Sequence, residues 1–201
     1  MRDSRNSTLL IPFLLLVFSS CSGQGRKPQK KDVQKYDIEK LSLTPDAATV
    51  KFLGNLNSKF IFNPNEVIFF TLEGVKTPDT SSVMLGKHVI RKKYGTVSPD
   101  VFLPFQLLLS DSSFYRLDDM QNKCLFVPDV AFECKIDNES VLILISLSCE
   151  QIGIEYKGNL KFEEFNFREI VLRYIASLAH DDKFIAAFHY LKNEDSQSNQ
   201  K

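Results

Sequence analysis

The sequence has no excess of charge of either sign. Of its 201 residues, 25 are lysine or arginine and 25 are aspartate or glutamate, so the formal net charge at pH 7 is zero. A protein that binds nucleic acid through its overall field carries a clear excess of basic residues. The balance therefore argues against nucleic acid as a partner. Tryptophan is absent, whereas phenylalanine occurs 17 times, which predicts a phenylalanine-rich core and specifies no ligand.

The motifs that define common enzyme classes are missing as well. The sequence contains no GxSxG elbow, no Walker A loop, no GxGxxG stretch and no CxxC pair. Its histidines, His88, His180 and His189, do not have the spacing of a zinc site with each other or with the cysteines. We therefore expect no catalytic residues, no metal and no cofactor, and we predict that the protein is not an enzyme.

Long hydrophobic runs are scarce, and the one at the N-terminus is short. Leu9–Phe18 has ten residues, interrupted by Pro12, and Ser19-Ser20-Cys21 follows it. Ten residues are too few to span a bilayer. Two arginines precede the run, so the layout is a basic start, an apolar stretch and then small residues. This layout is typical of an export signal.

The segment that ends at Cys21 resembles the signal peptide of a bacterial lipoprotein, with a lipobox-like sequence before the cysteine. Phe18 departs from the family pattern, which has leucine or another aliphatic residue there. The resemblance implies cleavage after Ser20, acylation of Cys21 and permanent anchoring in a membrane of the cell envelope. Ser22, where aspartate would retain the protein at the inner membrane, favours the outer membrane. The alternative is a secreted or periplasmic protein without a lipid.

Composition divides the chain into four parts. Residues 21–40 are rich in lysine and arginine and have little to bury, so they predict a flexible basic tether. We expect a signal peptide over residues 1–20 and a single α+β domain over residues 41–192, which is long enough for a real core. Residues 193–201 are polar and are expected to be disordered.

Hydrophobic periodicity predicts an antiparallel sheet with a helix packed on one face. The expected strands are Glu66–Leu72, Val83–Lys92 with a bulge at Gly86, Val130–Ile136, Val141–Cys149 and Gln151–Tyr156. The expected helices are Pro45–Leu53 after the cap Thr44, a helix after Ser98 that Pro104 delays, Phe167–Ala179 and Lys183–Leu191.

The hairpin in the middle of the domain has an apolar face. Pairing Ile136 with Val141 across a four-residue loop puts Phe132 opposite Ile145 and Cys134 opposite Ile143. All of these residues are apolar, so this face should cover the core. The other face is more polar, and we expect it to be more exposed.

Besides Cys21, three cysteines remain, which are Cys124, Cys134 and Cys149. An exported protein can form disulfides, and a bend at Pro128 would let Cys124 reach Cys149. Alternatively, the thiols are free and buried, which is the reading favoured by the apolar parity of Cys134 and Cys149. Metal or redox chemistry is the third reading.

Part of the chain resembles a known group of proteins. Three stretches are similar to segments of small uncharacterised bacterial proteins, namely Ser110–Tyr115, Lys123–Pro128 and Leu147–Glu150. That group has a Cys-x-Phe-x-Pro stretch, a hairpin and then a second cysteine, and the similarity covers about residues 107–180. The resemblance implies that Cys124 and Cys149 meet in space, and it implies no activity.

Taken together, these features predict an uncharacterised lipid-anchored envelope protein with a non-enzymatic structural or binding role. Its expected partners are the membrane, through the lipid anchor, and another envelope protein. The alternative is an envelope hydrolase or thiol-redox enzyme whose site is built from scattered residues. A cleft lined by converging polar groups would favour the enzyme, whereas an apolar surface patch would favour the binding protein.

Overall fold

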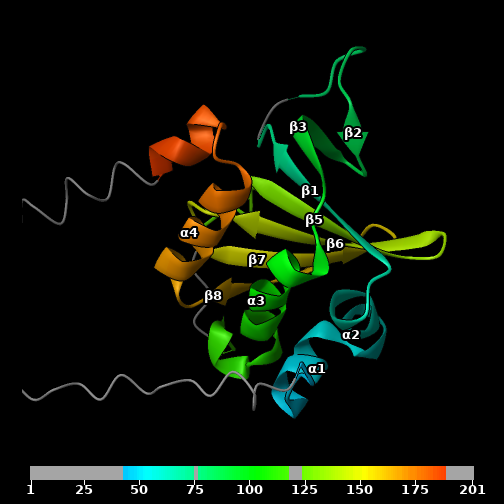
Figure 1. Cartoon of the computed structure of the whole chain (residues 1–201). Helices are drawn as coiled ribbons and strands as arrows, with labels where there is room; N and C mark the ends of the chain where they lie inside the picture. Colours follow the sequence, from blue (N-terminus) through cyan, green and yellow to red (C-terminus); the bar gives the residue numbers. More distant parts are fainter. Residues whose placement is uncertain (1–42, 75–76, 118–123, 189–201) are drawn as a thin grey trace, which may run out of the picture. The chain divides into compact units, whose positions relative to one another are not determined.

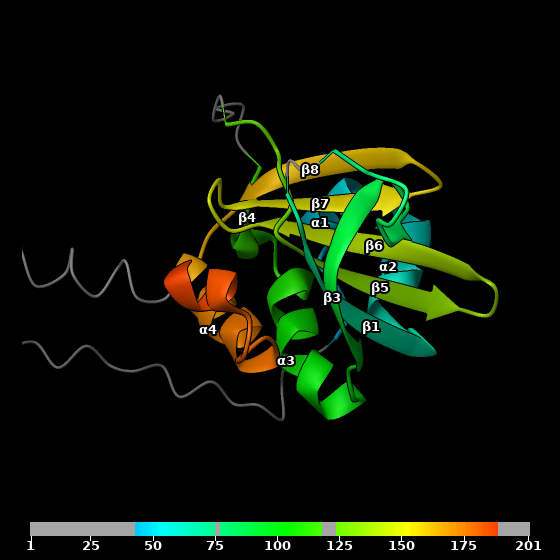
Figure 2. The same ribbon diagram turned by 90° about the horizontal axis from the view of Figure 1, so that it is seen from above.

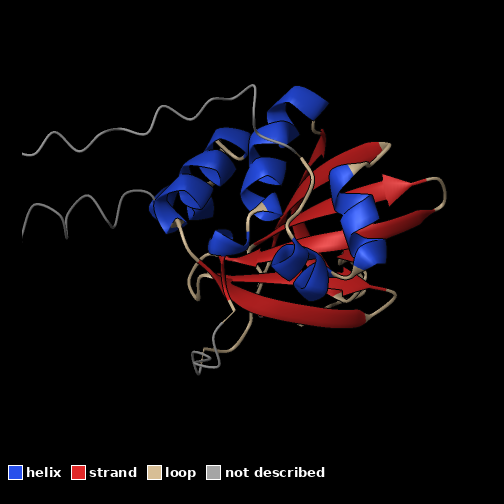
Figure 3. Cartoon of the chain, turned by 90° about the horizontal axis from the view of Figure 1, so that it is seen from below, coloured by secondary structure: helices blue, strands red, loops and turns tan. Residues whose placement is uncertain are grey.

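The computed structural model describes residues 43–74, 77–117 and 124–188, all of which belong to one compact unit. An antiparallel sheet of eight strands is packed against helices, which confirms the predicted single-domain α+β class (Figures 1 and 3). The predicted signal peptide over residues 1–20, Cys21 with the predicted tether, and the polar tail at residues 193–201 all lie outside the described residues. Within the described residues, no helix is both long enough and apolar enough to cross a membrane.

The strands are arranged in the order β2-β3-β1-β5-β6-β7-β8-β4. They are β1 Glu66–Leu72, β2 Met84–Leu85, β3 His88–Thr96, β4 Tyr115–Arg116, β5 Val130–Ile136, β6 Glu139–Ser146, β7 Gln151–Tyr156 and β8 Asn159–Phe165. The helices are α1 Ala47–Leu53, α2 Asn55–Phe62, α3 Pro99–Ser110, the 3-10 turn η2 Ser112–Phe114 and α4 Arg168–Leu178, and residues 183–188 are also helical.

One face of the sheet, which we term the helix face, packs against the helices (Figure 3). Its centre is Phe132 on β5, whose ring lies 4.9 Å from that of Phe69 and 5.1 Å from that of Phe105. Phe105 on α3 stacks in turn on Tyr174 of α4 at 5.2 Å. The predicted phenylalanine-rich core is therefore confirmed, and it is shared by the sheet, α3 and α4.

The predicted hairpin register is wrong by two residues. Ile136 pairs with Glu139 across the two-residue turn Asp137-Asn138, and Phe132 therefore lies opposite Ile143. Asp137 takes a φ of 54°, and a residue in this left-handed region suits a tight hairpin turn. Because the shift is an even number of residues, every side chain stays on its predicted face.

The opposite face, which we term the ribbon face, is more buried than predicted. Its centre is an apolar cluster of Ile68, Phe70, Leu72, Ala131, Leu142 and Leu144. In Figure 2 strand β3 crosses in front of β5 and β6, and Leu85 and Ile90 of the β2–β3 ribbon pack against this cluster. A tight turn at Gly86 joins β2 to β3. The single strand expected over Val83–Lys92 is therefore wrong, and Gly86 is the turn rather than a bulge.

Four other helices and strands also differ from expectation. α1 begins after Asp46, whose carboxylate accepts the N–H of Thr49 at 2.8 Å, so Thr44 is not its cap. α2 was not predicted, because Gly54 suggests a helix end but instead joins two helices. α3 begins at Pro99 and continues through Pro104 without delay, since its buried apolar side offsets the lost hydrogen bond. Strand β8 was also not predicted.

Candidate functional site

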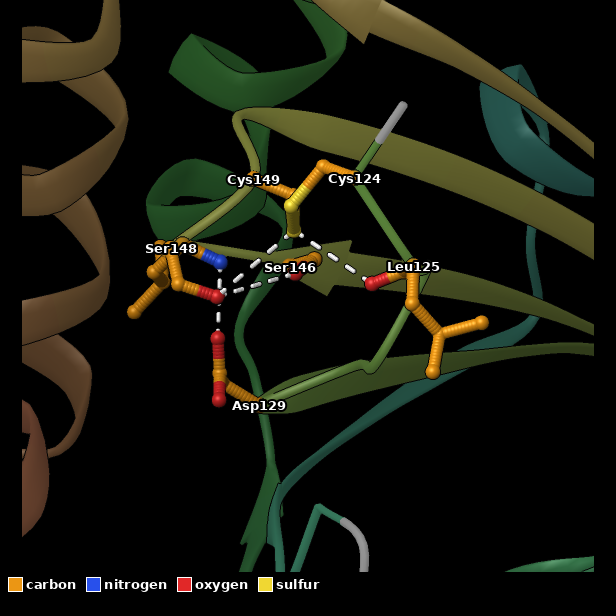
Figure 4. Close-up of a disulfide and its surroundings, with 7 residues drawn as sticks. Cys124, Leu125, Asp129, Ser146, Ser148 and Cys149 are labelled. Carbon is orange, nitrogen blue, oxygen red and sulfur yellow. Dashed lines mark hydrogen bonds between the residues drawn. A yellow bond between two sulfur atoms is a disulfide. The ribbon is translucent and has the colours of Figure 1, made fainter. Parts of the chain in front are cut away.

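The structure joins Cys124 and Cys149 in a disulfide, with the two Cα atoms 5.8 Å apart (Figure 4). Cys149 lies in the turn between β6 and β7, and Cys124 begins the loop that leads into β5. The sequence left three alternatives open for these cysteines, and the structure contains the disulfide between Cys124 and Cys149. Cys134 is the free thiol of the described residues, and burial raises its pKa well above the usual value, which keeps it unreactive.

A buried aspartate holds the turn that carries Cys149. The carboxylate of Asp129 accepts the backbone N–H of Leu147 at 2.7 Å and also that of Ser148 (Figure 4). Burial raises the pKa of Asp129 above its ordinary value, although these two donors oppose the shift. The backbone of Asp129 also bonds to β1 and β6, so the loop and the turn are fixed to each other and to the sheet.

An ion-pair cluster fixes the other side of the same turn. Glu150 accepts a hydrogen bond from Arg168 at 3.1 Å and one from Arg116 at 3.4 Å, and Arg116 also donates to Glu164 at 3.0 Å. Glu150 has a φ of 54°, which is uncommon for a non-glycine residue. Glu164 is buried here. Each arginine is already paired with a carboxylate, so the cluster is organised to hold structure.

The serines near the disulfide do not form a recognisable catalytic arrangement. The hydroxyl of Ser148 lies 3.5 Å from that of Ser146 and 3.9 Å from Sγ of Cys149. A serine nucleophile needs a base within hydrogen-bond reach, and these contacts are to a hydroxyl and a sulfur. Sequence reasoning had assigned no catalytic role to this region.

The disulfide loop presents an apolar surface to solvent. Leu125, directly after Cys124, has 77% of its surface exposed, and Phe162 on β8 has 40% exposed. Between them Phe126 turns inward and stacks on Phe162, with ring centres 5.4 Å apart. A Cβ at Gly153 would lie 2.7 Å from the ring of Phe126, so only glycine leaves room for it. We term Leu125, Phe126 and Phe162 the loop surface.

The loop surface was not identified from the sequence. The feature of the sequence that could have indicated it is the pair of adjacent large apolar residues, Leu125 and Phe126, directly after a cysteine. In an extended segment, adjacent residues point to opposite sides, so only one of the two can be buried in the sheet.

His88 and Asp182 each contact a residue from a distant part of the domain. His88 lies 3.2 Å from the carboxylate of Glu155, which is 6% exposed and also pairs with Lys87 at 3.3 Å. This contact holds the ribbon over β7. His180 is exposed, and the neighbouring Asp182 pairs with Arg91 of β3 at 3.3 Å. His189 lies outside the described residues.

Among residues 43–74, 77–117 and 124–188, no group of three or more His, Cys, Asp or Glu side chains is placed to hold a metal. A pocket of about 240 Å³ opens beside the start of α3. Two of its polar side chains are already bonded, since Glu66 accepts from Thr96 at 3.0 Å and Gln106 donates to the carbonyl of Ile61 at 2.8 Å.

Comparison with protein-family models, with curated proteins and with solved structures finds no match for this chain. The function is therefore argued from its own sequence and geometry.

Proposed function

We propose that this protein is a lipid-anchored component of a bacterial cell envelope and that its domain binds another envelope protein. The observation that carries the binding role is the loop surface, where Leu125 is exposed to 77% on a loop that is covalently held. Exposed apolar groups that are rigidly presented are typical of protein interaction sites.

The loop surface is organised before any partner arrives. The Cys124–Cys149 disulfide holds the start of the loop, Asp129 holds its end, and Phe126 anchors its middle against Phe162. A rigid loop loses little conformational entropy on binding, so more of the contact energy appears as affinity. Leu125 is the side chain that a recess on the partner would receive.

The disulfide also supports the proposed location. Disulfides persist in oxidising compartments, which include the bacterial periplasm and the cell surface. Export is what the signal-like segment before Cys21 predicts. Acylation of Cys21 would then keep the domain at the membrane through its basic tether.

Crosslinking in intact cells tests the binding role. The wild-type chain should capture a defined envelope protein, and Leu125→Ser should reduce that capture strongly. Val83→Ser is the matched control, because Val83 is an exposed apolar residue on the ribbon and not on the loop surface. Equal capture by Leu125→Ser and wild type would reject the loop surface as the binding site.

Fatty-acid labelling tests the anchor. A metabolic fatty-acid probe should label the wild-type chain, and Cys21→Ala should abolish the label and release the protein from membranes. An unlabelled, soluble wild-type chain would support the secreted or periplasmic alternative.

One observation favours the thiol-redox alternative. Cys124 is exposed as a residue, and a thiolate from solution that attacks its sulfur would form a mixed disulfide and release Cys149 as the thiolate. If the disulfide is catalytic, replacing both cysteines by serine abolishes the thiol-redox activity, whether or not the variant still captures the partner. If it serves only to hold the loop, the same variant loses capture in proportion to its loss of stability.

A further inference from the structure

Helix α3 has apolar side chains on its outer side as well as on its core side. From Val101 to Leu109 its only polar side chain is Gln106, and that side chain is buried and donates to the carbonyl of Ile61. A helix at the surface of a globular domain normally carries charged residues on its outer face. Between Asp100 and Asp111, which are exposed at its two ends, the outer face of α3 therefore departs from the usual pattern.

The outer residues of α3 form one stripe. Leu103, Pro104 and Leu107 are spaced at i, i+1 and i+4, which places them on the same side of a helix. Pro104 is exposed, and Leu103 and Leu107 are half-buried and belong to neither apolar cluster of the core. Val101, 43% exposed, extends the stripe toward α4, where the hydroxyl of Tyr174 donates to its carbonyl at 3.1 Å. We term Val101, Leu103, Pro104 and Leu107 the α3 stripe.

The described part of the chain begins next to this helix. The N–H of Asp46 donates to the carbonyl of Ser110 at the end of α3 at 3.1 Å, and its carboxylate accepts the N–H of Ser112 at 2.8 Å. Only about 20 residues separate Leu43 from Cys21, and a tether of that length with the flexibility that the sequence predicts would reach roughly 25 Å. An acyl chain on Cys21 would therefore keep the α3 stripe within reach of the lipid surface.

We propose that the α3 stripe rests on the membrane in which Cys21 is anchored. The inference rests on the proposed lipid anchor for its setting, because the anchor raises the local concentration of lipid and allows a weak contact to be populated. The stripe lies on the helix-face side of the sheet, whereas the loop surface lies on the ribbon face. A domain docked through α3 would thus keep the loop surface away from the lipid and open to a partner.

The charges around the stripe favour a lipid surface over a second copy of the chain. Asp100 and Asp111 are exposed and stand at the two ends of α3. In either orientation, two stripes packed along each other would bring carboxylates together at both ends, which is unfavourable. The same carboxylates predict that the stripe prefers zwitterionic lipid to anionic lipid.

Vesicle binding without the acyl chain tests this proposal. The chain from Ser22 to Lys201 lacks Cys21 and keeps the whole described unit. It should co-sediment with phosphatidylcholine vesicles, and Leu103→Ser combined with Leu107→Ser should weaken that partition by about tenfold. Leu125→Ser is the matched control and should leave it unchanged. With phosphatidylglycerol vesicles, the basic tether should give salt-sensitive binding that persists in both variants.

Three results would overturn the proposal. The first is that the chain does not bind phosphatidylcholine vesicles at any lipid concentration. The second is that the double-serine variant binds as well as wild type while its unfolding midpoint matches that of wild type. The third is that the chain forms a concentration-dependent dimer, which the double-serine variant does not form. The last result would assign the stripe to a second copy. The vesicle test uses a chain without an acyl group, so its outcome does not depend on the anchor. Failure of fatty-acid labelling would reject the proposed anchor and would not change the measured vesicle binding.

Discussion

The two faces of the sheet are held in different ways. The helix face is stabilised by the burial of a large apolar area, since rings from β1, α3 and α4 pack around Phe132 of β5. The ribbon face has a smaller apolar cluster and is closed by individual contacts, which include the Cys124–Cys149 disulfide and the pairs of His88 and Lys87 with Glu155. Packing over a large area tolerates the loss of one polar contact, whereas a face closed by a few contacts depends on each of them. Substitutions should therefore separate the two faces.

The largest effect is expected on the helix face. Phe132 is fully buried and contacts Phe69, Phe102 and Phe105. Phe132→Ala should lower the free energy of unfolding by about 3–5 kcal/mol, because it leaves a cavity among these rings. Denaturant unfolding measures the change.

The adjacent residue provides the control for this substitution. Glu133 points to the other face and pairs with Lys135 at 3.4 Å. Glu133→Ala should cost less than about 1 kcal/mol. Equal effects of the two substitutions would show that the helix face is not the main source of stability.

Loss of the disulfide should have the next largest effect. Cys124→Ser with Cys149→Ser should destabilise the domain by about 3 kcal/mol, because the bridge closes a loop of 25 residues. Adding a reductant should lower the stability of wild type to that of the variant and leave the variant unchanged. A wild-type protein whose unfolding midpoint does not respond to reductant would show that the bridge contributes nothing.

A single methyl group tests the packing of the loop surface. Gly153→Ala should cost about 1–3 kcal/mol, because its Cβ would lie 2.7 Å from the ring of Phe126. In a Phe126→Ala background the same change should cost much less, since the clashing ring is gone. Additive costs in the double variant would mean that Phe126 does not occupy this position.

The smallest effect is a difference in pH dependence between two aspartates. The pKa of Asp129 is raised, chiefly by burial, so the native state binds this proton more tightly than the unfolded chain does. The domain therefore gains stability from Asp129 as the pH falls toward the ordinary aspartate value. The pKa of Asp46 is lowered, chiefly by the N–H of Thr49, so its contribution is present above its unfolded value and is lost in acid.

Unfolding free energies of Asp129→Asn and Asp46→Asn between about pH 3 and about pH 7 measure this difference. As the pH falls, the free energy of unfolding of Asp129→Asn should drop further below that of wild type. Asp46→Asn should be less stable than wild type at neutral pH, and this difference should disappear in acid. Parallel profiles for both variants and wild type would contradict the two environments.

Local patterns predicted much of the fold. The strands Glu66–Leu72 and Gln151–Tyr156 and the helix near Phe167–Ala179 occur as predicted, because each has a strong hydrophobic period. The register of the central hairpin could not be fixed in this way. Two registers that differ by two residues place the same side chains on the same faces, and the conformation of Asp137 decides between them.

Features that depend on distant residues were not predictable from local sequence. The turn at Gly86 is held by the contact of His88 with Glu155, 67 residues away. Gly54 marks a helix end by its local chemistry, but a second helix follows it directly. The loop surface arises because Phe126 fills the space above Gly153 and leaves Leu125 outside. No periodic pattern encodes such a juxtaposition.

Site-specific photo-crosslinking in cells tests most directly whether the two sides of the domain have different roles. A photoreactive residue at position 125 should form adducts with a protein, whereas one at position 107 should form adducts with lipid. Both positions can be compared in otherwise identical chains that carry Cys21. Protein adducts from position 107 and none from position 125 would contradict the assignment of the loop surface to a partner and of α3 to the membrane.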